Sequence, residues 1–143
     1  MRRMEALTRR LDGVHDPVAL HAALAAEGAV PFLFRRTAGR AVIVVDEALR
    51  LEAKGRDARL AAVSEGGRLL LDQVAAATPE AVKERAADAI TFRFAPSSAH
   101  DEEERLAHPT AFDLVRAMVA ATGGEKEAVV AGVIGFDHVD LLE

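Results

Sequence analysis

Histidines and carboxylates gather in one segment of the chain, where they could ligate a metal. His100 and His108 flank the acidic run at 101–104. Imidazole nitrogens and carboxylate oxygens are suitable ligands for zinc or manganese, so the residue types have the right chemistry. Their spacing matches no standard metal site. Because like charges gather where water screens them, a solvated loop and helix start is the favoured interpretation.

A second candidate lies near the end of the sequence, where His138 stands between Asp137 and Asp140. A carboxylate beside an imidazole can orient it as a general base. A base of this kind acts with a nucleophile, and the sequence identifies none. A small enzyme that uses this histidine is therefore one hypothesis among several.

The motifs of common nucleotide-binding and hydrolytic sites are absent from the sequence. The glycine pairs at 66–67 and 123–124 precede no phosphate-binding pattern, and neither Gly-x-Gly-x-x-Gly nor a Walker-type Lys-Ser/Thr occurs. Ser97-Ser98 is not part of a nucleophile elbow. The sequence therefore predicts no catalytic residue and no metal ligand.

Three arginines give the strongest indication of a binding site. Arg35 and Arg36 end one predicted strand, and Arg40 begins the next. If these strands pair through the short connection at 37–39, three guanidinium groups crowd one end of a sheet. Like charges repel there unless an anion or a carboxylate is present. Two interpretations stay open: an exposed basic rim, and a site for a small anionic ligand.

The composition indicates a globular protein. Half of the 143 residues are hydrophobic, enough for one core, and we expect a single domain over 1–143. The formal net charge of -5 disfavours nucleic acid as a partner. No apolar run reaches the roughly 18 residues of a membrane span, and the first residues lack a secretion signal, so we expect a cytoplasmic protein without a membrane partner. The absence of Cys excludes disulfides and thiolate metal sites.

Hydrophobic periodicity and turn signals predict a mixed chain of helices and locally paired strands. Helices are expected at 17–27, 68–77, 79–89 and 109–122, and strands at 30–36, 40–46, 49–54, 60–64, 90–94 and 128–136. Asp16 caps the first helix, and the glycine pair at 66–67 is expected to break the strand pattern before the second helix. This order favours an α+β fold in which an antiparallel-rich sheet has helices packed mainly on one side.

The run at 128–136 has no polar side, which predicts a strand buried on both faces. Such a strand needs neighbours, yet the sequence ends soon after it without the usual helix stop signals. We therefore expect an interrupted chain whose last apolar surface is an unsatisfied interface. That surface would pack against a second domain or against a second copy of the chain in a homodimer.

Four blocks of the sequence carry a family resemblance. They are Pro-Phe-Leu-Phe-Arg-Arg at 31–36, Val-Val-Asp-Glu-Ala-Leu-Arg-Leu at 44–51, Phe-Arg-Phe-Ala-Pro at 92–96 with the segments 101–106 and 111–116, and Val-Ala-Gly-Val-Ile-Gly-Phe-Asp-His-Val at 130–139. In order and spacing they resemble the N-terminal region of component I of anthranilate synthase, a chorismate-utilising enzyme. The first block lies where that family has a Leu-Leu-Glu-Ser element, and the last is similar to its glycine-rich strand ending in Tyr-Asp.

The resemblance implies a place in tryptophan biosynthesis. The family converts chorismate, with Mg2+ and with ammonia from a glutamine amidotransferase subunit, into anthranilate and pyruvate. Its chorismate and Mg2+ ligands lie in a C-terminal half that, on this comparison, the chain lacks. We therefore expect a non-catalytic, regulatory N-terminal domain with no cofactor of its own, whose partners are a chorismate-binding domain and the amidotransferase subunit.

The resemblance also implies an effector site, because the family's N-terminal region contributes to an allosteric tryptophan pocket. Carried over by position, its residues are Phe34, Arg35, Arg36 and Arg40. Arg35 replaces an acidic residue and Arg36 a serine, so the ammonium of an amino acid would face positive charge. We expect weakened or lost tryptophan feedback and a more anionic ligand. The alternative is a free-standing sensor of a carboxylate or an amino acid derived from that domain.

Overall fold

The computed structural model divides the chain into two compact units, one from Leu7 to Glu47 and the other from Ala48 onward. The residues that the structure describes are 9, 12–13, 16–28, 32–35, 41–98, 101, 103, 107–123 and 129–132.

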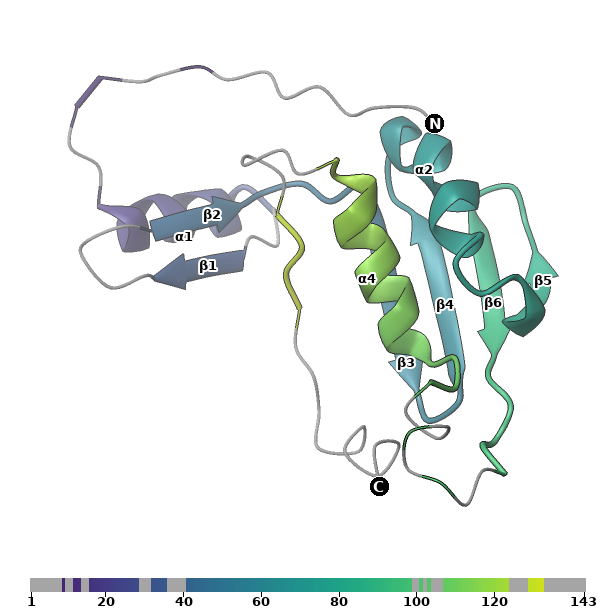
Figure 1. Ribbon diagram of the computed structural model, residues 1–143. Helices are drawn as coiled ribbons and strands as arrows, with labels where there is room; N and C mark the ends of the chain where they lie inside the picture. The colour runs from purple at the N-terminus through teal and green to yellow at the C-terminus, as the bar shows by residue number, and fades with distance from the viewer. Residues whose placement is uncertain are drawn as a thin grey trace. The chain divides into compact units, whose positions relative to one another are not determined.

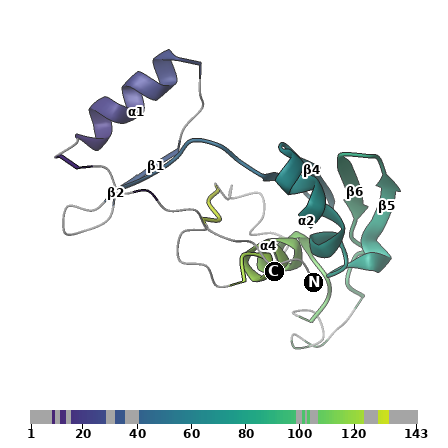
Figure 2. The same cartoon turned by 90° about the horizontal axis from the view of Figure 1, so that it is seen from above.

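The smaller unit contains one helix and one β-hairpin. Helix α1 (Pro17–Ala26) begins as predicted, with the Asp16 carboxylate accepting a hydrogen bond from the Val18 N–H at 3.0 Å. Strands β1 (Phe32–Arg35) and β2 (Ala41–Val44) pair in antiparallel register, which confirms the predicted hairpin. The helix lies beside the two strands, and none of its residues is buried (Figure 2).

The larger unit is built on a four-stranded antiparallel sheet. Its strands are β3 (Leu49–Lys54), β4 (Asp57–Ala62), β5 (Val82–Arg85) and β6 (Ala89–Arg93), in the spatial order β3-β4-β6-β5. Two helices, α2 (Glu65–Ala75) and α4 (Ala111–Ala121), lie in front of this sheet in Figure 1 and pack against each other. The fold is therefore α+β, with antiparallel sheets and helices on one side, as the sequence predicted.

The core lies between the four-stranded sheet and its two helices. Alternate residues of the central strands point inward, so Leu60 of β4 and Phe92 of β6 are almost fully buried. Val74 of α2 and Leu114 of α4 meet them from the helical layer, both with no exposed surface. The opposite face of the sheet carries charged residues such as Arg59, so it has the polar character of a solvated surface.

The predicted helix at 79–89 is wrong. A short 3-10 turn, η1 (Pro79–Ala81), leads instead into β5, which pairs with β6 and then turns back through an Ala86 N–H to Ala89 carbonyl bond of 2.8 Å. This segment has too few large apolar residues to form a helical stripe. A short, charged strand suits the edge of a sheet, where it discourages pairing with other chains.

Further predictions differ from the structure, among them the strand expected at 60–64, which is observed as β4 at Asp57–Ala62. The glycine pair does not precede the second helix but lies in the first turn of α2, where the Ser64 hydroxyl accepts a bond from the Gly67 N–H at 3.1 Å. The strand predicted at 128–136 is not found over 129–132, the part of it that the structure describes. Val129 and Val130 are 46% and 38% exposed and pair with no strand there. A continuous β-branched run is therefore insufficient to predict a buried strand when no neighbouring strand pairs with it.

Among the described residues, none of the helices combines the length and the apolar character that crossing a bilayer requires.

Candidate functional site

The structure places only part of the predicted arginine site. The backbone of Phe34 and Arg35 lies in β1, where Arg35 is opposite Ala41. Arg36 and Arg40 lie outside the described residues. The pairing through residues 37–39 that the arginine hypothesis assumed is consistent with this register. That the three arginines form an anion site stays a prediction.

The histidine candidates gain no support as a metal or catalytic site. The His108 Nε2–H donates to the Ala95 carbonyl oxygen at 3.0 Å, so this ring joins the start of α4 to the end of β6. His100 and His138 lie outside the described residues. Within the part of the chain that the structure describes, no three His, Asp or Glu side chains are grouped closely enough to hold a metal ion.

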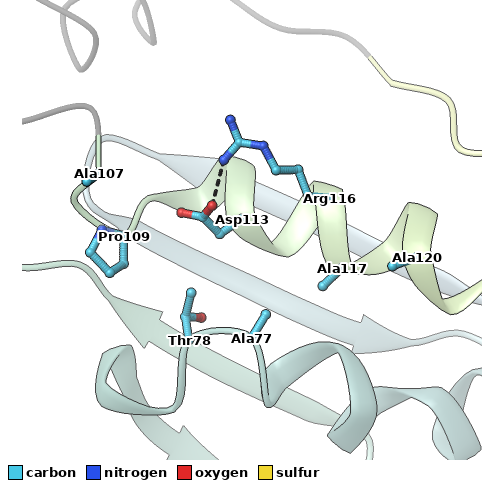
Figure 3. A pocket seen from close by; sticks show the side chains of 8 residues that line it. All are labelled: Ala77, Thr78, Ala107, Pro109, Asp113, Arg116, Ala117 and Ala120. Atoms are coloured by element: carbon cyan, nitrogen blue, oxygen red, sulfur yellow. Dashed lines mark hydrogen bonds and ion pairs between the residues drawn. The ribbon is translucent and has the colours of Figure 1, made fainter. Parts of the chain in front are cut away.

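A groove of about 520 Å³ lies in the larger unit, between the turn after α2 and helix α4 with the segment that precedes it (Figure 3). Its walls are mostly small apolar side chains, and its polar groups come from three residues. The lining residues are Ala77, Thr78, Ala107, Pro109, Asp113, Arg116, Ala117 and Ala120. Segments distant in the sequence thus form one open concave surface, the α2–α4 groove.

Thr78 is the unusual residue of the α2–α4 groove. Its side chain extends from the turn toward the groove, is only 1% exposed, and has a hydroxyl Oγ1 without a hydrogen-bond partner among the described residues. The backbone places it there: its N–H donates to the Ala75 carbonyl as α2 ends, and Pro79 begins η1 immediately afterwards. A buried hydroxyl without a partner costs stability, so it marks a position where a polar ligand atom would be favourable.

The charged side of the groove belongs to the first two turns of α4. The Thr110 hydroxyl accepts from the Phe112 N–H at 3.3 Å, and the Asp113 Oδ2 accepts from the Thr110 N–H at 2.8 Å. These reciprocal bonds form a capping box that fixes where the helix begins. The other carboxylate oxygen of Asp113 accepts from the Arg116 Nη1 at 2.6 Å, as the dashed line in Figure 3 marks. Both oxygens of Asp113 are thus engaged.

Arg116 retains binding capacity. Its side chain is 76% exposed, and its ion pair with Asp113 uses one guanidinium nitrogen, Nη1. A guanidinium carries five N–H donors, so several remain for another acceptor. Asp113 and Arg116 are the charged residues that line the groove, and their charges balance.

Sequence reasoning did not identify the α2–α4 groove. Thr78 precedes the helix predicted at 79–89, and nothing local in the sequence shows that it faces α4. The Thr-x-x-Asp spacing at 110–113 is a capping signal that could have located the start of α4 more closely. The groove itself depends on a contact between segments more than thirty positions apart, which periodicity does not reveal.

Comparison with known proteins gives one distant similarity. The chain is 29% identical over 111 residues to anthranilate synthase component 1, pyocyanine specific, from Pseudomonas aeruginosa. The match covers 76% of this chain and 21% of that protein, so the chain spans about a fifth of the length of the curated relative it matches. No family model matches the chain, and no solved structure matches it significantly.

The similarity extends across both units. A contiguous match over three quarters of the chain necessarily includes the segment from β2 to β6. Strand β2 of the smaller unit and the sheet of the larger one therefore share one relative. A distant relation to anthranilate synthase component 1 follows from this match.

Proposed function

We propose that this chain corresponds to the N-terminal, non-catalytic region of a protein related to anthranilate synthase component I. The similarity to one such protein across both units carries the proposal. The parent reaction makes anthranilate and pyruvate from chorismate, using ammonia or glutamine and Mg2+. In this role the chain supports a chorismate-binding domain and modulates it through a small effector, and the amidotransferase subunit is a further partner.

A direct test uses the chain both alone and in a hybrid. In the hybrid, this chain replaces the matching segment of the Pseudomonas aeruginosa protein, and anthranilate formation is followed by its fluorescence after addition of chorismate, ammonia and Mg2+. We expect no anthranilate from the chain alone and measurable formation by the hybrid.

The controls make both parts of the proposal refutable. Anthranilate produced by the chain alone would contradict a non-catalytic role. A soluble hybrid without activity, beside an active parent protein purified in the same way, would contradict the structural correspondence. A hybrid that carries Leu60→Ala, which removes a buried core side chain, shows whether activity depends on a folded replacement segment.

A second candidate is a free-standing sensor of a carboxylate or an amino acid. The β1–β2 register favours it, because Arg35 lies opposite Ala41, the residue that follows Arg40 in the chain. Isothermal titration with tryptophan, chorismate and acetate distinguishes this candidate from a purely structural region. Heat of binding that disappears in Arg35→Gln supports it, and the absence of binding by all three compounds rejects it.

A further inference from the structure

We propose that the α2–α4 groove binds a small organic carboxylate with an apolar body. This site goes beyond the proposed function, because it uses none of the arginines near the β1–β2 hairpin and lies wholly within the larger unit. Three features carry the inference: an unpartnered hydroxyl, apolar walls, and unused guanidinium donors.

The hydroxyl of Thr78 is a polar group at the wall of the groove that has no hydrogen-bond partner among the described residues. Its side chain is 1% exposed, so bulk water does not replace the missing hydrogen bond. A ligand oxygen that meets Oγ1 after the Thr78 side chain rotates toward the groove would restore that bond, and the rotation breaks no hydrogen bond of the hydroxyl. The gain is therefore specific to a ligand that carries a hydrogen-bonding group in that place.

The apolar walls of the groove determine what kind of ligand body fits beside the polar group. Four alanines and Pro109 line the rest of the groove and offer no further hydrogen-bonding side chains. Small side chains leave room for a flat or compact apolar body and gain free energy when it excludes water from them. A sugar or a polyphosphate would leave most of its polar groups unpaired against these walls.

The ion pair of Asp113 and Arg116 determines the sign of the charge that the ligand should carry. Both oxygens of Asp113 already accept hydrogen bonds, whereas Arg116 uses only Nη1. The donors that remain suit an acceptor, and a planar guanidinium matches the geometry of a carboxylate. A cationic ligand would instead have to displace Arg116 from Asp113. An anion is therefore the ligand that the groove favours.

Benzoate is a suitable probe because it combines a carboxylate with an apolar ring. In a titration of the 15N-labelled full chain, we expect the amide signals of residues 77–78, 113 and 116–117 to shift, with a dissociation constant of about 1 mM, as suits so small a ligand. Acetate lacks the apolar body and benzyl alcohol lacks the charge, so each should bind about tenfold more weakly.

Substitutions at Thr78 and Arg116 test the two polar contacts of the proposed site. Thr78→Val keeps the shape of the side chain and should weaken benzoate binding about fivefold, and Arg116→Met should weaken it about tenfold. Matched controls lie elsewhere in the same unit. Thr91→Val removes the other buried, unpartnered hydroxyl found among the described residues, and Arg93→Met removes an exposed arginine paired with Asp57. Both controls should bind benzoate as the unmodified chain does.

Two results would overturn the proposal. One is the absence of amide shifts in the groove at about ten times the expected dissociation constant. The other is binding that is unchanged in both groove variants. If benzoate binding is lost in Arg35→Gln but kept in Arg116→Met, the carboxylate site belongs to the arginines of the smaller unit. Activity of the hybrid enzyme does not enter this test, so the two proposals fail separately.

Discussion

At the scale of single residues, Thr78 and Thr91 share one property and differ in their surroundings. Each has a buried hydroxyl oxygen without a partner among the described residues. Thr78 lies in the α2–α4 groove, whereas Thr91 lies in β6 between Ile90 and Phe92, the residues that point into the core. Substitution of Thr91 therefore measures the energetic cost of an unpartnered hydroxyl alone, whereas substitution of Thr78 also tests the proposed role of its hydroxyl in ligand binding.

We predict that Thr78→Val stabilises the ligand-free chain by about 1 kcal/mol, because valine removes an unsatisfied hydroxyl and keeps the shape of the side chain. Thr91→Val should have an effect of similar size and sign. Urea unfolding followed by circular dichroism measures both. A Thr78→Val chain that is less stable than the unmodified one would indicate that the hydroxyl is already hydrogen-bonded, for example to a buried water.

A second prediction at this scale concerns the arginines that replace acidic and hydroxyl residues of the related family. In the hybrid enzyme, Arg35→Glu with Arg36→Ser should raise tryptophan affinity at least about tenfold, since the ammonium of the amino acid then meets a carboxylate instead of a guanidinium. Inhibition of anthranilate formation by tryptophan reports the change. Arg93→Glu reverses a charge in the larger unit and should leave tryptophan affinity unaltered, and equal affinities in all three proteins would refute the assignment.

At the scale of elements, the beginning of α2 depends on a glycine. Gly67 donates to the Ser64 cap, and a Cβ at this position would overlap the carbonyl oxygen of Ala48. That carbonyl also accepts from the Val63 N–H at 2.9 Å, so it is held in place. The close approach of the helix to the chain that enters β3 therefore requires the absence of a side chain.

The adjacent glycines allow a matched test. Gly67→Ala should lower the unfolding free energy by about 2 kcal/mol or more, because the Ala48 backbone has to move. Gly66→Ala meets only the Ser64 Oγ, at an ordinary contact distance of 3.7 Å, and should raise it by about 0.5 kcal/mol through helix propensity. Thermal and urea unfolding measure both variants, and equal effects would contradict the close-approach explanation.

Some helices and strands could be predicted from the sequence, and others could not. Alternation and capping signals predicted β3, β6, α1 and the β1–β2 hairpin, because these features depend on neighbouring residues. The edge strand β5 was missed because its few residues carry no strand-like alternation and its pairing with β6 supplies the stability. The groove was missed for a similar reason: Thr78 and Arg116 meet only after α2 and α4 pack together, and that packing depends on the whole sheet.

At the scale of the whole molecule, the buried core belongs to the larger unit. The buried hydrophobic residues that the structure describes run from Ala58 to Ala121, and none lies in α1. Helices α2 and α4 bury their apolar faces on the four-stranded sheet of that unit. The burial of apolar surface that stabilises the larger unit against its chain entropy therefore comes from residues that follow β2 in the sequence.

We therefore predict that a shortened chain beginning at Ala48 still unfolds cooperatively in urea. It retains the Ala48 carbonyl that accepts from Val63 and the complete sheet with both helices. In this shortened chain, Leu60→Ala should cost about 2–5 kcal/mol, as expected for a core residue with no exposed surface. A gradual transition that Leu60→Ala leaves unaltered would mean that residues before Ala48 are required for folding, so that the chain folds as the single domain expected from its composition.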